Sequence, residues 1–392
     1  MGPTAVVSRR GADRVRTGHP WVYRSDVISV AAEPGDLVCV SNDRDRHVGW
    51  AFFSSVSQIT LRFVSTARRV PDERTLIGSR LAEAAAYRRS LDIDATAYRL
   101  LNGEADRLPA TVVDRYADDT GSWFVVQTLS EASDRRLALL CELLIEQFEP
   151  QGILARNDPK VRRLEGLPEQ VEVLYGDVPD RVMVREGVVR YAADLRHGQK
   201  TGLFLDQREN HAAAARYTHG ATLDAFTYNG GFALQMAARA RSVLALDASE
   251  SAVASTRANA AANGVTNVEV RVANVFDELR ELEIAGASFD TIVLDPPAFA
   301  KNRDAIERAI AGYKEINLRA LRILSPGGHL ITCSCSYNLD EAVFLHTVQQ
   351  AAIDAHATIA LVEKRMQARD HPVLLGVPET YYLKCLIVRK LA

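Results

Sequence analysis

Two cysteines lie one residue apart in the stretch ITCSCSYNLD at 331–340, at the end of an apolar run. A thiol that is even partly ionised at neutral pH is a strong nucleophile. Such a thiol can add to carbon 6 of a pyrimidine, which makes carbon 5 an enamine carbon that accepts a methyl group. Side chains alternate along a strand, so Cys333 and Cys335 are expected on one face. Because Cys335 is nearer the strand end, we expect it to be the nucleophile.

The other four cysteines are expected to have only a packing role. Cys333, Cys39, Cys141 and Cys385 are expected to be small buried side chains, as most free cysteines are. A Cys-x-Cys pair is also half of a zinc site, but no second Cys or His pair with zinc spacing occurs in the sequence. No metal is therefore expected.

A second reactive motif is IVLDPPAFAK at 292–301, where Asp295 ends an apolar strand. Pro296 and Pro297 stiffen the loop that follows, and Phe299 is placed to stack on a planar ring. Asp-Pro-Pro with an aromatic residue is known in methyltransferases that act on planar nitrogenous rings, although Pro-Pro alone is a common turn stiffener. A suitably protonated Asp295 would hydrogen-bond the ring N3 and the exocyclic amine of cytosine.

The stretch LDAFTYNGGFAL at 223–234 has the pattern of a strand followed by a helix. Gly230 and Gly231 let the backbone approach a ligand and leave free N–H groups at the helix start. The third glycine of the dinucleotide fingerprint is missing. Asp224, Phe226 and Tyr228 precede the glycines, and an acid there can hold an ammonium group. A nucleotide with a cationic amino-acid arm fits better than a dinucleotide, although a plain strand–helix turn fits equally well.

Two further strand ends carry polar side chains. Asp247 ends SVLALD, where an acid can accept both ribose hydroxyls; its alternative role, capping the next helix, can be filled by Ser249. Asn274 follows the next strand and is placed to meet an adenine edge, or it serves the turn. Together these strand ends describe S-adenosylmethionine better than NAD.

The elements that must position these residues alternate between strand and helix. The predicted strands span 221–226, 242–247, 268–274, 289–295, 328–336, 357–363 and 381–390. The predicted helices span about 231–240, 249–262, 303–324 and 339–356. Such alternation predicts an α/β fold with a doubly wound, mostly parallel sheet, in which ligands bind beyond the carboxyl ends of the strands.

Two smaller parts precede this sheet. Residues 1–69 contain β-like runs bounded by turn residues, which predict a small barrel or sandwich. Residues 70–182 read as an α+β module with amphipathic helices at 73–91 and 134–148. The remaining domain, 183–392, begins with a hairpin that turns at Glu186–Gly187.

Composition supports a cytoplasmic protein. Five scattered cysteines argue against a disulfide framework, and no apolar run approaches the roughly 18 residues of a membrane span. The net charge is −3, but residues 1–69 contain ten arginines, no lysine and six acids. Arginine suits phosphate contacts, although a GC-rich genome would also explain its excess over lysine.

Taken together, these motifs resemble those of the bacterial large-subunit rRNA cytosine-C5 methyltransferases that carry an N-terminal PUA domain. The resemblance covers nearly the full length, and the KTG-FLDQR block is its most specific part. The matching stretches are GHPWVYRSDV (18–27), LNGEADRLPATVVDRY (101–116), GQKTGLFLDQREN (198–210), FTYNGGFAL (226–234), LDPPAFAK (294–301), GYKEIN (312–317), SCS (334–336) and HPV (371–373).

The resemblance implies an RNA-binding PUA domain at 1–69, a central domain at 70–182 that helps form an RNA cleft, and a class I S-adenosylmethionine domain at 183–392. It implies that Cys335 is the nucleophile, that ribosomal RNA is the partner, and it is compatible with a homodimer. It also implies a set of residues near the cofactor. This set comprises Lys200, Thr201, Phe204, Asp206, Arg208, Asp224, Phe226, Tyr228, Gly230, Gly231, Asp247, Asn274 and Asp295.

The sequence departs from the common pattern in three places. Cys333 stands where an aromatic or aliphatic residue is frequent, so a second thiol could share the chemistry. Asn274 replaces the usual aspartate but can still accept from the amino group of adenine through its carbonyl oxygen. No cysteine follows the prolines after Asp295, so the base that removes the carbon-5 proton is not identified.

Three alternatives remain open. An exocyclic-amine RNA methyltransferase would use DPPAF with Cys335 only as packing. A non-catalytic RNA-binding assembly factor would retain the cofactor fold without turnover. An NAD enzyme is disfavoured by the missing third glycine.

Overall fold

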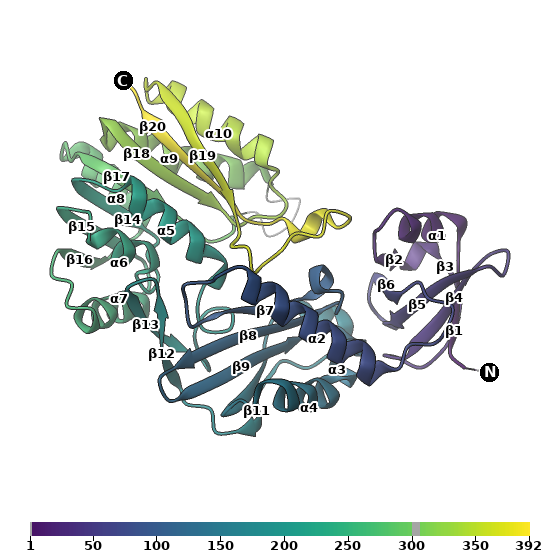
Figure 1. Ribbon diagram of the computed structural model, residues 1–392. Helices are drawn as coiled ribbons and strands as arrows, with labels where there is room; N and C mark the ends of the chain where they lie inside the picture. The colour runs from purple at the N-terminus through teal and green to yellow at the C-terminus, as the bar shows by residue number, and fades with distance from the viewer. Residues whose placement is uncertain (1, 300–305) are drawn as a thin grey trace. The chain divides into compact units, whose positions relative to one another are not determined.

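The computed structural model describes residues 2–299 and 306–392, which form two units (Figure 1). The first unit contains Met1–Val184, Ala193–Leu205 and Asp370–Thr380. The second contains Arg185–Ala192, Asp206–Arg369 and Tyr381–Ala392. Within the described residues, no helix combines the length and the apolar character that crossing a membrane requires.

The first unit begins with a six-stranded sheet in the order β2-β6-β5-β4-β1-β3. Its strands are β1 (Thr4–Val7), β2 (Trp21–Tyr23), β3 (Val27–Ala31), β4 (Leu37–Asn42), β5 (His47–Phe53) and β6 (Ile59–Ser65). The last three correspond to the β-like runs bounded by turn residues that the sequence predicted. The helix α1 (Arg9–Arg16) was not predicted, because only Gly11 and Ala12 of it are buried and the apolar stripe is too short to see. Ser8 caps it by accepting from Gly11 N–H at 3.1 Å.

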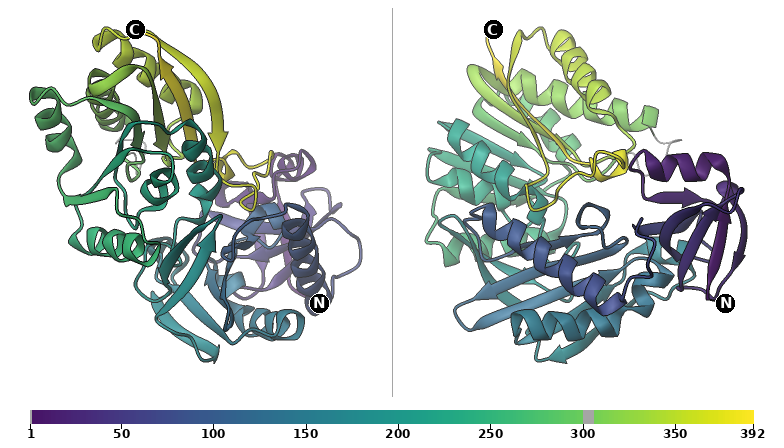
Figure 2. Two further views of the ribbon diagram at one scale, coloured as in Figure 1. Left: turned by 60° about the vertical axis from the view of Figure 1, so that its left-hand side comes forward. Right: turned by 45° about the vertical axis from the view of Figure 1, so that its right-hand side comes forward.

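A five-stranded sheet follows in the same unit, in the order β11-β10-β9-β8-β7. Its strands are β7 (Tyr98–Asn102), β8 (Thr111–Asp118), β9 (Gly121–Thr128), β10 (Gly152–Asn157) and β11 (Gln170–Gly176). The same part of the chain contains the helices α2 (Glu73–Ser90), α3 (Glu131–Arg135) and α4 (Leu137–Phe148). Helices α2 and α4 lie along this sheet (Figure 2). Their apolar stripes pack on it through Leu81, Leu144 and their neighbours. This is the α+β module that the sequence predicted.

A hairpin then joins the two units along the chain. Its strands are β12 (Arg181–Glu186) and β13 (Val189–Asp194), so the turn at Gly187–Val188 lies within one residue of the predicted position. Gly187 has a φ of 57°, a left-handed conformation that glycine adopts without a steric penalty.

The second unit contains a seven-stranded sheet in the order β16-β15-β14-β17-β18-β20-β19. Its strands are β14 (Ala221–Ala225), β15 (Ser242–Asp247), β16 (Val268–Val272), β17 (Phe289–Leu294), β18 (Leu324–Ser334), β19 (Ile359–Met366) and β20 (Lys384–Lys390). Strands β14 to β18 pair in parallel, while β20 is antiparallel to β18 and β19. The chain builds outward from β14 on one side and then restarts at β17 on the other, so the switch point lies between β14 and β17.

Helices cover both faces of this sheet (Figure 1). They are α5 (Arg208–Tyr217), α6 (Gly231–Ala237), α7 (Glu250–Ala262), α8 (Val275–Ile284), α9 (Ile306–Ile323) and α10 (Glu341–Asp354). Helices α5 to α7 pack on the face that carries Val293 and Ile331, and α8 to α10 pack on the face that carries Ile292 and Leu330. The predicted doubly wound fold is thereby confirmed. Helices α5 and α8 were not predicted, and 303–305 of the predicted helix 303–324 lie outside the described residues.

Candidate active site

The turn after β14 has a strained backbone. Phe226 and Tyr228 have φ values of 69° and 52°, and Gly230 has 89°, so left-handed residues alternate along the turn. A non-glycine residue in this region costs roughly 1–3 kcal/mol, and such strain concentrates at functional sites. The carboxylate of Asp247, at the end of the neighbouring β15, holds the turn by accepting from Tyr228 N–H at 2.9 Å. Three residues that the sequence assigned to the cofactor therefore lie in one turn, and a fourth, Asp247, holds that turn from the neighbouring strand.

The start of α6 lies directly against an imidazole. A Cβ atom on Gly231 would lie 2.6 Å from Cε1 of His211, so only glycine fits there. His211 Nδ1 is 2.9 Å from Glu186 Oε1. Burial lowers the pKa of His211, but the Glu186 carboxylate, with Asp295 and Asp224, raises it above its ordinary value overall. The glycine turn thus faces an imidazole that is inclined to carry a positive charge.

Asp224 is buried in β14 with part of its carboxylate unused. Its Oδ2 accepts from the hydroxyl of Thr227 at 2.6 Å and from Ala233 N–H at 2.9 Å. Its Oδ1 is buried without a hydrogen-bond partner among the described residues. Burial raises the pKa of Asp224 to about 6. A buried carboxylate oxygen of this kind fits an ammonium group, which is the cation on the amino-acid arm of S-adenosylmethionine.

Asp247 and Asn274 each accept a hydrogen bond from the protein backbone. The sequence alone left open whether these side chains hold the backbone or bind a ligand. Asp247 Oδ1 accepts from Ser249 N–H at 2.9 Å, and Ser249 alone caps α7, as predicted. Asn274 is exposed and caps α8, where its Oδ1 accepts from Phe276 N–H at 3.0 Å. The Oδ1 atom of Asn274, which was expected to accept from the amino group of adenine, therefore already accepts one hydrogen bond from the backbone. Its second lone pair remains for a ligand.

Asp295, just beyond β17, is held by a relay of amide side chains. Gln207 donates from Nε2 to Asp295 Oδ1 at 2.8 Å, and Asn210 donates to Gln207 Oε1 at 2.7 Å. Arg365 donates in turn to Asn210 Oδ1 at 2.9 Å. Gln207 and Asn210 belong to the FLDQREN block. The side chain of this block that contacts Asp295 is therefore Gln207, which the sequence did not single out.

The thiol of Cys335 is partly exposed and lies beside the Asp-Pro-Pro motif. Its Sγ is 3.8 Å from the carbonyl oxygen of Pro296. Strand β18 ends at Ser334, two residues before the predicted end, so strand alternation does not fix the direction of Cys335. Cys333 is fully buried opposite Cys385, and burial raises its pKa well above the ordinary value. Among the two cysteines of the motif, only Cys335 is accessible.

Polar groups hold the backbone on both sides of Cys335. Ser334 Oγ donates to the hydroxyl of Tyr313 at 3.0 Å, and that hydroxyl is 3.1 Å from Ser336 Oγ. Lys384 Nζ donates to the carbonyl oxygen of Ser336 at 2.9 Å. Burial lowers the pKa of Lys384, while the Asp340 carboxylate and, to a smaller extent, negative charge on Cys335 and Glu341 oppose that change. A buried cation therefore interacts with the candidate nucleophile.

Three residues that the resemblance placed near the cofactor belong to the first unit. Thr201 is fully buried, where its hydroxyl donates to Asp114 Oδ2 at 2.6 Å and lies 3.0 Å from the hydroxyl of Tyr116. Lys200 Nζ lies 4.8 Å from the centre of the Phe204 ring, a cation–π contact. A cofactor role for these three residues stays a prediction.

Asp206 and Arg208 lie in the second unit, at the start of α5. Asp206 is 2% exposed, and its Oδ2 accepts from the hydroxyl of Tyr382 at 2.6 Å. Arg208 is 6% exposed. Both side chains are therefore buried within the second unit, and their contact with a cofactor also stays a prediction.

Sequence reasoning missed several side chains of this site. Lys384 had a usable signal, because it is a lone charge inside the apolar run YYLKCLIV. Glu186, His211 and Gln207 had none, because their meaning depends on neighbours distant in the sequence. Tyr313 lies in GYKEIN, which the sequence matched without assigning a role. In the described part of the chain, no group of His, Cys, Asp and Glu is arranged to hold a metal ion.

Comparisons with known proteins agree with this architecture. Residues 6–66 match the PUA-like domain family, and residues 218–374 match a methyltransferase domain family. The predicted PUA and methyltransferase domains are thus confirmed. The crystal structure of SMU.776 complexed with SAH has a TM-score of 0.84 at 20% identity over 99% of both chains, which shows a shared fold.

Relatives named ribosomal RNA large subunit methyltransferase I are similar along almost the whole length. The protein from Shewanella amazonensis is 38% identical over 95% of this chain and 95% of its own. The protein from Aliivibrio fischeri is 36% identical over 97% and 98%, respectively. Similarity at this level over both domains shows common descent, and the chain belongs to the ribosomal RNA large subunit methyltransferase I family.

Proposed function

We propose that this protein methylates carbon 5 of a cytosine in large-subunit ribosomal RNA, with S-adenosylmethionine as cofactor and Cys335 as the covalent nucleophile. One observation carries the proposal: the accessible thiol of Cys335 lies 3.8 Å from the Pro296 carbonyl of the Asp-Pro-Pro motif. A thiol in that position serves a reaction that begins with addition to a ring. Methylation of an exocyclic amine needs no such thiol.

The cofactor would be held at the carboxyl ends of β14, β15 and β16. Asp224 Oδ1 would accept from its ammonium group, and the Gly230–Gly231 turn would lie along its amino-acid arm. Asp247 would accept from the ribose hydroxyls, and Asn274 would contact the adenine. When bound, S-adenosylmethionine supplies an electrophilic methyl group on a sulfonium ion.

The chain's own residues account for the remaining steps. The Cys335 thiolate adds to carbon 6, and the electrons of the C5–C6 double bond become available at carbon 5. Carbon 5 then takes the methyl group, and the bond from methyl to the sulfonium sulfur would break so that the sulfur leaves as a neutral thioether. Asp295 faces the developing charge at N3; because Gln207 donates to Oδ1, the proton of a neutral Asp295 is on Oδ2. A base then removes the carbon-5 proton, and the electrons return to expel the Cys335 thiolate.

RNA containing 5-fluorocytidine tests this function. A base can remove a proton from carbon 5 but cannot remove fluorine. The Cys335 thiol is then not eliminated, and the enzyme stays covalently attached to the RNA after methyl transfer. We expect a complex that survives denaturing electrophoresis, forms only with S-adenosylmethionine, and is absent in Cys335→Ala but present in Cys333→Ala. An exocyclic-amine methyltransferase would transfer tritiated methyl groups without forming this complex. A non-catalytic assembly factor would show neither activity.

The proposal also covers partner and location. We infer that the substrate is ribosomal RNA and that the enzyme acts in the cytoplasm; a homodimer stays a prediction. Mapping of methylcytosine in ribosomal RNA from cells with and without the gene would identify the target nucleotide.

A further inference from the structure

Three stretches that carry the family resemblance meet inside the first unit. They are LNGEADRLPATVVDRY (101–116), the KTG part of GQKTGLFLDQREN (198–210) and HPV (371–373). The last two lie in Ala193–Leu205 and Asp370–Thr380, segments that belong to this unit although they are distant along the chain. Side chains that join the three stretches form a network that we call the clamp. Its members are Arg88, Arg99, Asn102, Asp114, Thr201 and Asp370.

An ion pair between Arg99 and Asp114 forms the centre of the clamp. Arg99 donates from Nε and Nη2 to the two carboxylate oxygens of Asp114, at 2.8 and 2.9 Å. The Asp114 side chain is fully buried, and that of Arg99 is 13% exposed. A buried charge is tolerated only with a paired and hydrogen-bonded partner, so each of these side chains fixes the position of the other.

The segment Ala193–Leu205 is attached to this ion pair through Thr201. The Thr201 hydroxyl donates to Asp114 Oδ2 at 2.6 Å, and the residue is fully buried. Arg156 adds a second attachment by donating to the carbonyl oxygen of Gly198 at 3.1 Å. The first segment is therefore fixed by one side-chain contact and one backbone contact.

The second segment is attached to the same ion pair at its start. Asp370 is fully buried, and its Oδ2 accepts from the backbone N–H of Arg99 at 2.9 Å. Arg88 donates to the carbonyl oxygen of Asp370 at 2.6 Å, and Asn102 donates to that of Pro372 at 3.1 Å. Arg99 thus connects the two segments, through its side chain to one and through its backbone to the other.

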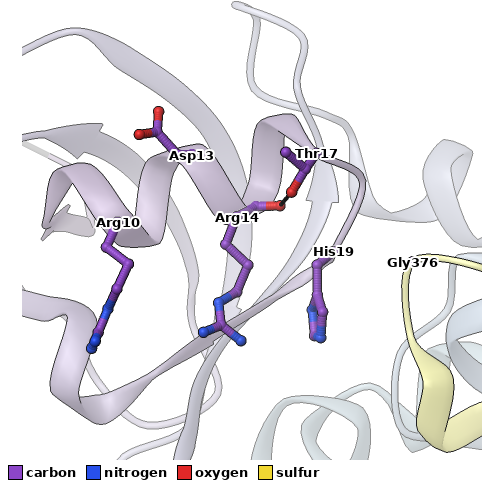
Figure 3. Close-up of a pocket in the computed structure, with 6 residues that line it drawn as sticks. All are labelled: Arg10, Asp13, Arg14, Thr17, His19 and Gly376. Carbon is purple, nitrogen blue, oxygen red and sulfur yellow. Dashed lines mark hydrogen bonds between the residues drawn. The ribbon is translucent and has the colours of Figure 1, made fainter.

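A close backbone contact fixes the later part of the second segment. Gly376 and His19 line the same hollow at the end of α1 (Figure 3). A Cβ atom on Gly376 would lie 2.4 Å from the carbonyl oxygen of Gly18, so only glycine permits this approach. The segment is therefore anchored within the first unit before the chain leaves that unit after Thr380.

Both segments continue into residues that hold the reactive groups of the second unit. The first continues into Gln207, which donates to Asp295. The second continues into Lys384, which donates to the backbone beside Cys335. Each segment thus leads along the chain to one group of the proposed reaction.

The two stretches of chain are also joined where they enter the second unit. The hydroxyl of Tyr382 donates to Asp206 Oδ2 at 2.6 Å. The backbone N–H of Ala368 donates to the carbonyl oxygen of Asp206 at 2.8 Å. Because Asp206 is 2% exposed, these contacts are shielded from water. A displacement of one stretch is therefore transmitted to the other.

We propose that the clamp positions Asp295 and Cys335 for methyl transfer by fixing the two segments that lead to them. Its members act through Gln207 and Lys384 and are therefore positioning residues. The inference rests on the proposed function for the identity of the reacting groups. A reaction between oriented groups can lose about 10²-fold in rate when one group is misplaced by about 1 Å, so contacts distant from the chemistry affect the rate.

The experiment compares two buried threonine hydroxyls that hold different parts of the first unit. Thr201→Val removes the donor to Asp114 and keeps the shape of the side chain. Thr128→Val is the matched control, because Thr128 is also fully buried and its hydroxyl donates to Asp134 at 2.8 Å. Thr128 lies in β9, outside both segments. Urea denaturation establishes the stability of each variant, and rates are compared where both are folded.

We expect Thr201→Val to lower the single-turnover rate of tritiated-methyl transfer to large-subunit ribosomal RNA about 10-fold. Its dissociation constant for S-adenosylmethionine, measured by calorimetry, should stay that of the parent protein. Thr128→Val should transfer methyl groups at the parental rate. Thr201→Ser retains the hydroxyl and should recover most of the rate.

A second pair of variants tests the other segment and does not depend on the folding of Thr201→Val. Asp370→Ala removes the acceptor of the Arg99 N–H, whereas Asp370→Asn retains an oxygen at that position. We expect Asp370→Ala to raise the pH midpoint of Cys335 alkylation by iodoacetamide, because Lys384 is no longer held in place. Asp370→Asn should keep the parental midpoint. A role in stability alone would leave both midpoints unchanged.

The proposal is overturned if folded Thr201→Val transfers methyl groups as fast as Thr128→Val, or if Asp370→Ala leaves the alkylation of Cys335 unchanged. It is also overturned if Thr201→Val weakens binding of S-adenosylmethionine as much as it slows transfer, since Thr201 would then contact the cofactor. Tritium counting detects methylation of any RNA atom. A slow Thr201→Val variant of a protein that forms no adduct with 5-fluorocytidine would therefore refute the proposed function and leave the positioning of Asp295 standing.

Discussion

The buried ammonium group of Lys384 donates a hydrogen bond to the carbonyl oxygen of Ser336, 2.9 Å away, in the residue that follows Cys335. Strand pairing places Lys384 opposite Ser334, the residue that precedes Cys335. A second bond, to the carbonyl oxygen of Tyr382 at 3.3 Å, prevents the ammonium group from moving away. The cation therefore lies beside the backbone of the candidate nucleophile, where it would favour the thiolate that the proposed reaction requires.

Replacing Lys384 with Met should make Cys335 harder to ionise. We expect the pH midpoint of its alkylation by iodoacetamide to rise, because a positive charge near the thiolate is lost. Site-resolved mass spectrometry measures this and separates Cys335 from the other partly exposed thiols, Cys39 and Cys141. Lys384→Arg retains the charge and is the control; an equal shift in both variants would mean that packing, not charge, is responsible.

Cys333 should be dispensable for chemistry but not for packing. It is fully buried in a cluster that includes Val293 and Ile387. We expect Cys333→Ala to form the adduct with 5-fluorocytidine and to lose about 1 kcal/mol of unfolding free energy, the transfer and cavity cost of a small side chain. Urea denaturation measures the latter. Loss of the adduct in a folded Cys333→Ala protein would show that the second thiol shares the reaction.

The fold should lose stability between acidic and neutral pH because of Asp224. Its pKa is raised from 3.8 to about 6, so the folded state binds the proton more tightly than the unfolded state. This contribution is complete below pH 3.8 and is lost as the pH rises through about 6, a change of about 3 kcal/mol. Asp224→Asn should remove this contribution to stability. Urea denaturation of both proteins at pH 5 and pH 7.5 measures the change. The comparison separates the effect of Asp224 from that of His211 and Asp247, the charged groups that act on Asp224.

The same carboxylate should make cofactor binding depend on pH. An ammonium group beside Asp224 stabilises the ionised form, so calorimetry should find tighter binding of S-adenosylmethionine at pH 7.5 than at pH 5. Asp224→Asn should bind weakly at both values. Equal affinity of the parent protein at both pH values would show that the ammonium group lies elsewhere.

Gly231 should tolerate no side chain while His211 is present. We expect Gly231→Ala to lose about 1–3 kcal/mol of unfolding free energy, because the added Cβ meets the imidazole at 2.6 Å. In the Gly231→Ala/His211→Ala double variant the loss should be smaller than the sum of the two single losses, because the clash is gone. Additive losses in urea denaturation would contradict this contact.

Local patterns in the sequence were sufficient to predict the main architecture. Apolar runs that alternate with amphipathic segments predicted the doubly wound sheet. The expectation that acids at the strand ends contact the ligand stays a prediction. Ser249 as the cap of α7 and the turn at Glu186–Gly187 were also predicted. All of these depend on residues within about one turn or one strand of each other, and such interactions are readable from the order of residues.

Only the tertiary structure decided which polar groups meet. Lys384 and Ser336, His211 and Glu186, and Gln207 and Asp295 are pairs separated by 48, 25 and 88 residues. Many other pairs of polar side chains in this sequence could form hydrogen bonds. A hydrogen bond requires donor and acceptor atoms about 3 Å apart in space, and the sequence spacing does not fix that distance. The sequence by itself determined where the reactive groups stand along the strands. Packing of distant segments decided which of those groups are buried, which are charged and which remain accessible, because burial and neighbouring charges arise only when the chain has folded.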